Sequence, residues 1–191
     1  GLFSNPWQMI RYPGLTAQAE KYGFIVVAPM GYNSRGWYGS RGQKSDLSVP
    51  KNLGELSEKD VLNVVANTQK EFSVDTRNIF LMGHSMGGGG TWHLGMKYPE
   101  KWTALAPLAP AAPNNIADLK KIKDKPVIMV MGTSDFLWRS CLPWVEEMKK
   151  LKMDYEYVEV KNGGHLLSVI QKLPEVFTFF EKHQHKPRKK R

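Results

Sequence analysis

Short runs of apolar, often β-branched residues alternate along this chain with longer segments whose apolar residues recur at helical spacing. A continuous apolar run is typical of a strand buried on both faces, and the helical repeat is typical of a helix with one buried side. Strands that alternate with helices form a parallel sheet. We therefore predict an α/β fold, a mostly parallel sheet with helices on both faces. The predicted strands are residues 23–29, 79–82, 102–109, 127–131 and 155–160, and the predicted helices are residues 13–22, 57–72, 86–98, 142–151 and 167–182.

Local signals set the ends of two of these helices. Gly23 is a good C-terminal stop for the first helix. Ser57 is a candidate N-cap for the second, because its hydroxyl can accept a hydrogen bond from a backbone N–H of the first turn. Residues 30–53, rich in Gly, Ser, Arg and aromatic residues, predict a long surface loop between them.

The chain of 191 residues suits one domain and has no internal repeat or linker. Its net charge of +9 comes largely from the end of the chain. Residues 186–191 hold five of the 27 basic side chains, which leaves 22 basic against 18 acidic side chains, or +4, in the rest. We predict a domain over residues 1–182 and a disordered basic tail over residues 183–191. The alternative, an RNA-binding module, lacks the usual stacking motifs, so we expect no nucleic-acid partner.

No run of about 18 uncharged apolar residues occurs, so we expect neither a membrane-spanning helix nor a membrane partner. The only cysteine, Cys141, excludes an internal disulfide and fits a small buried residue. It does not fix the compartment, and secreted and cytoplasmic locations both stay open. With no phosphate-binding glycine loop and no metal-ligand spacing, the sequence predicts no cofactor and no metal.

The sequence Gly-His-Ser-Met-Gly, residues 83–87, stands where a predicted strand ends and a helix begins. A sharp turn there holds the Ser85 hydroxyl at a helix N-terminus, where backbone N–H groups and the helix dipole favour negative charge. The flanking glycines leave no Cβ to collide with neighbouring chain. The Met86 N–H would then donate to a developing oxyanion, and the side chains of His84 and Met86 receive no role. The alternative is a structural glycine-rich turn with an idle serine.

A serine hydroxyl needs a base and an orienting acid to become a nucleophile. Of the acids compared, only Asp135 follows a buried strand within a short turn. His165 follows the strand 155–160 in the turn Asn-Gly-Gly-His. Since carboxyl ends of parallel strands share one edge, Ser85, Asp135 and His165 are predicted to form a triad. The candidates set aside are Glu100, Asp118, Asp124, Asp154, His93, His183 and His185.

These motifs, GHSMGGGGTW, MGTSD and NGGHL, resemble those of the α/β-hydrolase superfamily. More narrowly, the chain resembles the esterase and prolyl-oligopeptidase-like branch, with its feruloyl-esterase and polyhydroxybutyrate-depolymerase relatives. The segment YPGLTAQAEKYGFIVVAPMGY is similar to the part of those enzymes that follows the oxyanion loop. The resemblance extends to about residue 182. It implies a serine hydrolase in which serine, acid and histidine follow in this order along the chain.

The resemblance also implies a strand ending in His-Gly ahead of the first helix, inside the sheet beside the nucleophile strand. Gly1 resembles that glycine, which would make the Leu2 N–H the second oxyanion donor. We therefore expect the first strands of the fold to be absent from this chain and to belong to an N-terminal segment of the same protein.

The function expected from these residues is hydrolysis of short or soluble carboxylic esters through an acyl-enzyme, with a small-molecule ester as the substrate. No long insertion for a lid is present, and Trp37 and Trp138 are candidate walls of the substrate pocket, as are Tyr38 and Phe136. Two alternatives stay open: a serine peptidase of the same superfamily, and a catalytically dead hydrolase fold used for binding. The sequence does not predict an oligomeric state.

Overall fold

The computed structural model describes residues 1–41 and 50–186, and its centre is a parallel four-stranded sheet in the order β1-β2-β3-β4. Neighbouring strands pair in parallel, for example Met82 with Ala106 and Met129 with Tyr157. Every residue of β2 and β3 is buried, which requires covered faces on both sides of the sheet. The predicted α/β class with a parallel sheet is confirmed. The strands are β1 (Phe80–His84), β2 (Ala104–Leu108), β3 (Val127–Gly132) and β4 (Tyr155–Val160).

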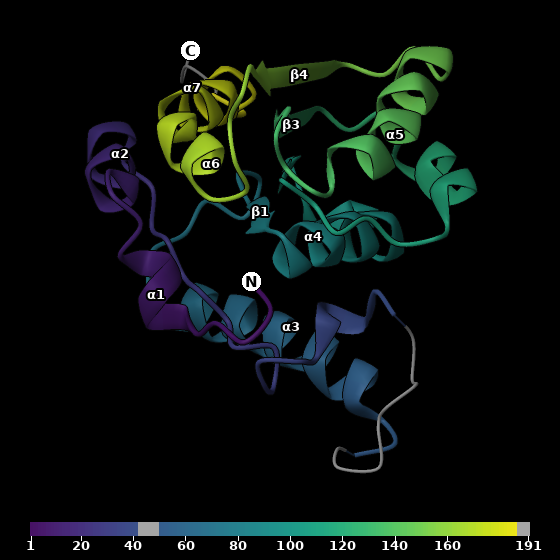
Figure 1. Ribbon diagram of the computed structural model, residues 1–191. Helices are drawn as coiled ribbons and strands as arrows, with labels where there is room; N and C mark the ends of the chain where they lie inside the picture. Colours follow the sequence, from purple (N-terminus) through teal and green to yellow (C-terminus); the bar gives the residue numbers. More distant parts are fainter. Residues whose placement is uncertain (42–49, 187–191) are drawn as a thin grey trace.

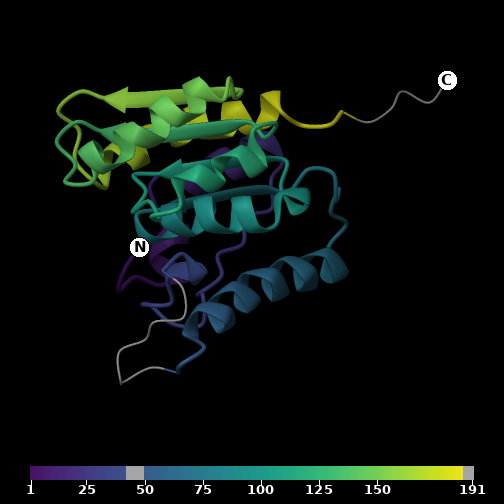
Figure 2. The same cartoon turned by 90° about the vertical axis from the view of Figure 1, so that its right-hand side faces the viewer.

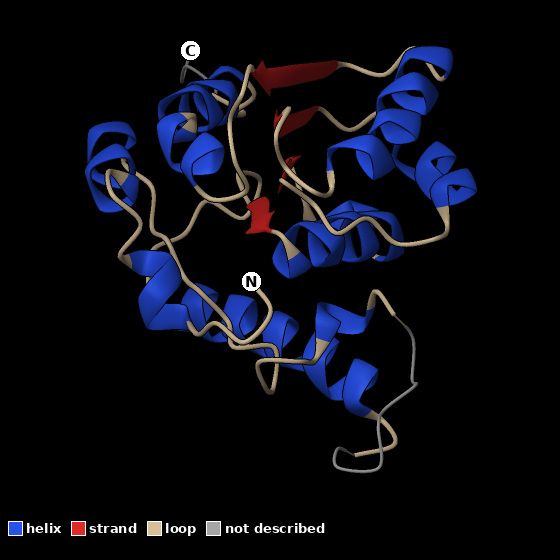
Figure 3. Cartoon of the chain, viewed as in Figure 1, coloured by secondary structure: helices blue, strands red, loops and turns tan. Residues whose placement is uncertain are grey.

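Helices cover the two faces of this sheet, as Figures 1 and 3 show. On one face, α4 (Met86–Lys97) and α5 (Trp138–Lys150) pack together, and the rings of Trp92 and Trp144 stack 4.8 Å apart. On the other face lie α2 (Leu15–Tyr22), α6 (Leu167–Gln171) and α7 (Leu173–Lys182). There the Phe80 ring of β1 lies 4.8 Å from Phe180 of α7.

The remaining helices are α1 (Pro6–Ile10), α3 (Leu53–Glu71) and three short 3₁₀ turns, η1 (Trp37–Gly39), η2 (Pro99–Lys101) and η3 (Ile116–Ile122). Figure 2 shows α3 outside α4, on the side away from β3 and β4. The prediction of Ser57 as an N-cap is wrong. Helix α3 begins one turn earlier, and the buried Ser57 hydroxyl accepts a hydrogen bond from the Tyr38 N–H at 3.0 Å.

The predicted helix over residues 167–182 is two helices, α6 and α7, which meet at Lys172. Pro174 explains the break, because proline fits the first turn of a helix and cannot donate within its interior. Helix α2 ends as predicted, since Gly23 adopts a left-handed φ of 69° and its N–H returns to the Ala19 and Glu20 carbonyls.

The prediction of a strand over residues 23–29 is wrong. The backbone of residues 24–30 belongs to no strand, and Ile25 and Val27 are 52% and 41% exposed. Within the described residues β1 is an edge strand, so no partner lies beside this segment at the 4.8 Å that strand pairing needs. An apolar cleft of about 240 Å³ lies there instead, lined by residues 24–30 on one side and by β1 on the other.

The packed chain extends past the predicted boundary at residue 182. His183 bonds through Nε2 to Asp154 at 3.1 Å, and the His185 N–H donates to the Asn78 side chain at 2.7 Å. Residues 187–191 of the predicted tail, and 42–49 of the predicted loop, lie outside the described part of the chain. Over the described residues, no helix combines the length and the hydropathy needed to cross a membrane.

Candidate active site

Ser85 occupies the turn between β1 and α4 with φ 58° and ψ −116°, an unfavourable backbone conformation for a residue with a side chain. Three backbone hydrogen bonds hold it there. The Ser85 N–H donates to the Leu108 carbonyl at 2.9 Å, and the Ser85 carbonyl accepts from Gly89 and Ala111 at 3.0 and 2.9 Å. The strain at Ser85 is thus fixed by the end of β2 and the first turn of α4.

The two glycines that flank this turn have different roles. A Cβ on Gly83 would lie 2.2 Å from the Gly87 carbonyl oxygen, so no larger residue fits without backbone movement. A Cβ on Gly87 would meet only a Tyr38 ring carbon at 3.9 Å, an ordinary contact. Of the two flanking glycines, only Gly83 therefore has to lack a Cβ, whereas the sequence predicted this for both.

The glycines that follow in α4 allow neighbouring chain to approach the helix closely. A Cβ on Gly88 or Gly89 would collide with the backbone at Pro110 and Ala111, and a Cβ on Gly90 would collide with the Tyr38 side chain. Each glycine costs about 1 kcal/mol of helix stability relative to alanine. The close approach brings the loop after β2 and the ring of Tyr38 against the first turns of α4, next to Ser85.

Asp135 and His165 form a hydrogen-bonded pair at the carboxyl ends of β3 and β4. The Asp135 carboxylate is fully buried, and its Oδ2 lies 2.7 Å from His165 Nδ1. Its Oδ1 accepts the Leu137 N–H at 2.8 Å. Because a carboxylate only accepts, the neutral His165 ring carries its hydrogen on Nδ1 and donates it to Asp135.

The two turns that carry this pair are joined by backbone contacts. Thr133 N–H donates to the Val160 carbonyl and Ser134 N–H donates to the Gly163 carbonyl, both at 3.0 Å. A Cβ on Gly132 would lie 2.2 Å from that same Gly163 oxygen, so the close approach requires glycine. Asp135 and His165 are therefore carried by two turns that contact each other directly.

The third predicted residue, Ser85, lies at the same edge of the sheet. Its neighbour His84 contacts His165, with ring centroids 4.6 Å apart and His84 Nε2 3.0 Å from the His165 carbonyl oxygen. Gly1 also lies here, since a Cβ on it would be 3.7 Å from the Ser85 Cβ, and Figure 1 shows the N-terminus near the start of α4. The structure thus brings Ser85, Asp135 and His165 to one edge, with Leu2 directly following Gly1.

The aromatic residues proposed as pocket walls have separate locations. Phe136 is 78% exposed and its ring lies 4.8 Å from His165. Trp138 points to β4, where its indole N–H contacts Tyr157 and Glu159 at 3.2 Å. The guanidinium of Arg41 lies 3.7 Å from the Trp37 ring. Tyr38 and not Trp37 lines the apolar cleft beside β1.

Other reactive groups in the described residues are engaged elsewhere. Cys141 is buried, its Sγ donates to the Pro110 carbonyl, and burial raises the pKa of the thiol to about 12. It therefore stays protonated at neutral pH. His93 bonds to Glu58 Oε1 at 2.8 Å, away from the sheet edge. No cluster of three or more His, Cys, Asp or Glu side chains in the described ranges has a metal-binding arrangement.

A model of the family described as serine aminopeptidase, S33, matches residues 8–183. The chain belongs to this family. The match confirms the α/β-hydrolase fold and the serine hydrolase class that the motifs predict. The fold is shared with the S-formylglutathione hydrolase of Staphylococcus aureus, at a TM-score of 0.73 and 18% identity over 95% of this chain and 78% of that one.

Curated relatives of this chain include both peptidase-named and esterase-named proteins. The rat acylamino-acid-releasing enzyme is 36% identical over 157 residues, which are 80% of this chain and 20% of that protein. A bifunctional acetylxylan esterase/xylanase of Neocallimastix patriciarum is 29% identical over 117 residues, 61% of this chain and 15% of that protein. The chain thus spans about a fifth or less of the length of these relatives.

Sequence analysis gave no role to the His84 side chain or to Tyr12, yet both lie at this site. The Tyr12 hydroxyl lies 2.7 Å from His84 Nδ1. The position of His84 next to Ser85 is visible in the sequence. Its contact with Tyr12 joins residues 72 positions apart, so only the folded chain reveals it.

Proposed function

We propose that this chain carries the catalytic site of a serine carboxylesterase that cleaves short or soluble esters through an acyl-enzyme. The observation that carries the proposal is the buried Asp135 carboxylate bonded to His165 Nδ1 at 2.7 Å, at the sheet edge where Ser85 begins a helix. Buried charge is costly unless it is paired, and this arrangement matches the acid and base of a serine nucleophile.

In the proposed reaction, His165 Nε2 takes the proton of the Ser85 hydroxyl while Oγ attacks the ester carbonyl. The backbone N–H groups of Met86 and Leu2 bind the oxyanion that forms. Asp135 holds the His165 ring and stabilises its imidazolium. The alcohol then leaves with the proton from His165, and water cleaves the acyl-enzyme with the roles reversed.

The backbone around Ser85 supports this assignment of the oxyanion donors. Met86 is the first residue of α4, so its N–H has no acceptor within the helix. The Gly1 contact with Ser85 brings the Leu2 peptide near the same position. Of the aromatic residues, Phe136 is best placed to contact an acyl or alcohol group, because it is exposed beside His165. Trp37 and Trp138 stay candidates for more distant walls.

A second candidate is a peptidase that releases acylated amino acids. It is favoured by the 36% identity to the rat acylamino-acid-releasing enzyme. The same triad would then cleave an amide, with His165 protonating the leaving amine. The esterase proposal draws support from the relatives named as acetylxylan esterases, which match at 29% and 32% identity over 61% and 45% of this chain. An N-acetylalanine p-nitroanilide assay beside the ester assay separates the two.

We also propose that an additional strand of the same protein occupies the apolar cleft between β1 and residues 24–30. Two features support this: the edge position of β1, and the apolar lining that Val26, Ala28 and Leu81 contribute. An edge strand offers a row of backbone N–H and C=O groups for pairing. The added strand would convert residues 24–30 into a paired strand and would brace the Ser85 turn from its open side.

The test of the esterase is hydrolysis of p-nitrophenyl acetate and butyrate by the chain and by its Ser85→Ala variant. We expect kcat/KM to fall by at least about a thousandfold in the variant. Covalent labelling by a fluorophosphonate, read by intact mass, identifies the reacting serine independently of turnover. Labelling at a residue other than Ser85, or equal ester hydrolysis by Ser85→Ala, would contradict the proposal.

A further inference from the structure

His84 is a buried polar side chain next to the nucleophile, with a partner on each ring nitrogen. It is 5% exposed. Its Nδ1 lies 2.7 Å from the Tyr12 hydroxyl, and its Nε2 lies 3.0 Å from the backbone carbonyl oxygen of His165. The Tyr12 ring packs edge-on against the imidazole, with centroids 5.8 Å apart. Both polar atoms of the ring are therefore satisfied by groups distant in sequence.

The partners fix the direction of these hydrogen bonds. A backbone carbonyl only accepts, so His84 Nε2 carries the hydrogen and donates to His165. In the neutral ring Nδ1 is then an acceptor, and the Tyr12 O–H donates to it. The chain of hydrogen bonds runs from Tyr12 through His84 to the backbone of His165.

The surroundings of His84 keep it in this neutral form. Burial, then the neighbouring His165, lower its pKa to about 4. Asp135 and the His165 carbonyl act in the opposite direction, and Tyr12 has its own pKa raised by burial. Near neutral pH the ring can therefore accept from Tyr12 and donate to His165 simultaneously.

His84 contacts the last residue of the turn that leads from β4 to His165. His165 follows Asn162, Gly163 and Gly164, and Asn162 has a positive φ of 57°. The start of this turn is held by the Asn162 N–H to Thr133 Oγ1 at 2.7 Å and by the Gly163 carbonyl. A Cβ on Gly164 would meet nothing within 4 Å, and the Gly164 carbonyl accepts a hydrogen bond from the Ser168 hydroxyl at 2.7 Å. The His84 bond restrains the backbone of His165 itself.

We propose that His84 is a positioning residue, which fixes the backbone of the general base His165 relative to the adjacent nucleophile Ser85, with Tyr12 setting the orientation of the His84 ring. His84 and Ser85 are consecutive, so one rigid turn carries both the nucleophile and the anchor for the base. The inference rests on the proposed function, because positioning matters only if Ser85 and His165 react.

The test compares His84→Phe, His84→Gln and Tyr12→Phe. Phenylalanine keeps an aromatic ring and removes both hydrogen bonds, whereas glutamine keeps an N–H able to reach the His165 carbonyl. We expect kcat for p-nitrophenyl butyrate to fall about 30-fold in His84→Phe with KM within twofold. His84→Gln should recover most of this loss, and Tyr12→Phe should lose about threefold.

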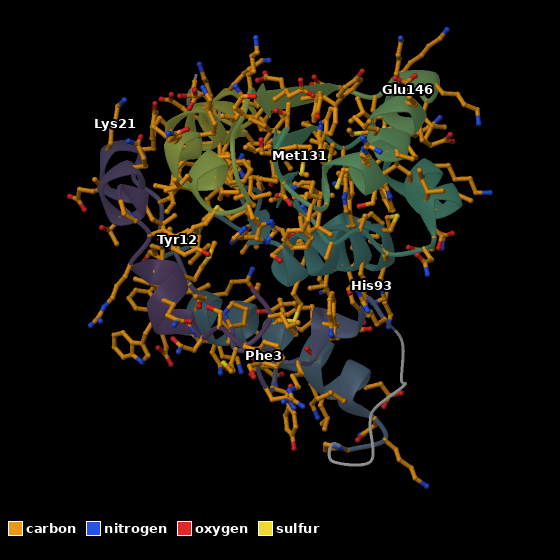
Figure 4. All side chains as sticks on the ribbon, viewed as in Figure 1. Phe3, Tyr12, Lys21, His93, Met131 and Glu146 are labelled. Carbon is orange, nitrogen blue, oxygen red and sulfur yellow. The ribbon has the colours of Figure 1, made fainter. Side chains whose placement is uncertain are left out.

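A structural readout separates failure of this proposal from failure of the esterase proposal. The downfield proton resonance of His165 Nδ1–H, bonded to Asp135, reports the position of His165 without any substrate. We expect it to shift or broaden in His84→Phe and to persist in His84→Gln. His93→Phe is the matched control, since His93 bonds to Glu58 and lies far from Tyr12 in Figure 4.

An unchanged resonance in a folded His84→Phe protein overturns the positioning role, whatever its activity. So does a kcat within twofold of the starting protein, or a His84→Gln variant as impaired as His84→Phe. If no chain hydrolyses the ester but the resonance responds as expected, the positioning of His165 stands and the esterase proposal fails.

Discussion

Two apolar segments of similar composition have different structures in this protein. Residues 23–29, Gly-Phe-Ile-Val-Val-Ala-Pro, and β3, Val-Ile-Met-Val-Met-Gly, are both continuous apolar runs. Every residue of β3 is buried between β2 and β4, whereas Ile25 is 52% exposed and its segment pairs with no strand. The difference lies in their neighbours, because a strand is stabilised by hydrogen bonds and side-chain pairs across to adjacent strands. An apolar run favours an extended, buried strand, but the strand forms only where neighbouring strands are present to pair with it.

Hydrogen exchange gives the largest contrast between the two segments. The backbone amides of β3 are hydrogen-bonded inside the sheet and should exchange only when the sheet unfolds. Among the described residues, no strand pairs with residues 25–28, so their amides should exchange more easily. We expect exchange rates that differ by at least about a thousandfold. Equal protection would show that residues 25–28 pair as a strand in solution and would remove the distinction.

The same measurement tests the added strand proposed for the apolar cleft. In a longer form of the protein that supplies this strand, the amides of residues 25–28 should gain protection approaching that of β3, because they acquire a ladder partner. A scrambled sequence of equal length, without an apolar run, is the control. Unchanged exchange in the longer form argues against a strand in the cleft.

Paired isoleucine truncations measure the same contrast in unfolding free energy. Ile128 of β3 is 0% exposed and Ile25 is 52% exposed. We expect Ile128→Ala to lower the free energy of unfolding by about 3 kcal/mol, and Ile25→Ala to lower it by less than about 0.5 kcal/mol. Urea denaturation of both variants checks this. Similar losses would mean that Ile25 is buried in solution.

The buried Glu58 carboxylate joins α3 to α4 and to Tyr98 through polar contacts. Glu58 of α3 is buried against Gly39 and bonds to His93, Lys97 and Tyr98 at 2.8, 2.6 and 3.0 Å. Burial acts to raise the pKa of the Glu58 carboxyl, but the bonds from Lys97, His93 and Tyr98 leave it lowered. A lowered pKa in the folded state stabilises the fold above the unfolded value of about 4.3.

We therefore expect Glu58→Gln to cost about 1 kcal/mol at pH 7, and this cost to shrink as the pH falls below about 4 and the carboxylate protonates. Urea unfolding at several pH values measures it. Glu55→Gln is the control, since Glu55 is exposed in the first turn of the same helix and should change stability by less than about 0.5 kcal/mol. A cost that persists below pH 4 means that the charge is not its source.

Most of the sheet, and the positions of Asp135 and His165, were predictable from apolar runs and turn residues close together in the sequence. The strands 127–131 and 155–160 and the helix after Ser85 follow from apolar runs and glycine signals close in sequence. Asp135 and His165 were predictable because each follows a strand within a short turn, and the parallel topology brings these ends together. The structure places the pair in hydrogen-bond contact. Their roles with Ser85 stay a proposal for the assay.

Features that depend on distant partners were not predictable. Ser57 has the chemistry of an N-cap, yet its hydroxyl serves the Tyr38 N–H. Trp37 and Tyr38 are adjacent in sequence, yet Tyr38 packs against Gly90 and lines the apolar cleft, whereas the Trp37 ring lies under the Arg41 guanidinium. An N-cap hydrogen bond stabilises a helix by about 1 kcal/mol, and a single tertiary hydrogen bond contributes as much, so the tertiary contact can decide where the hydroxyl points.

The sequence by itself determined the α/β class, the order of the strands β1 to β4 and the strand-to-helix turn at Ser85, because these depend on periodicity and on residues within a few positions of each other. The tertiary structure decided whether residues 23–29 have a strand partner and which glycine the turn requires. It also brought Tyr12 to His84, and His84 to the backbone carbonyl of His165. Pairing and close approach are properties of two segments at once, so neither segment encodes them alone.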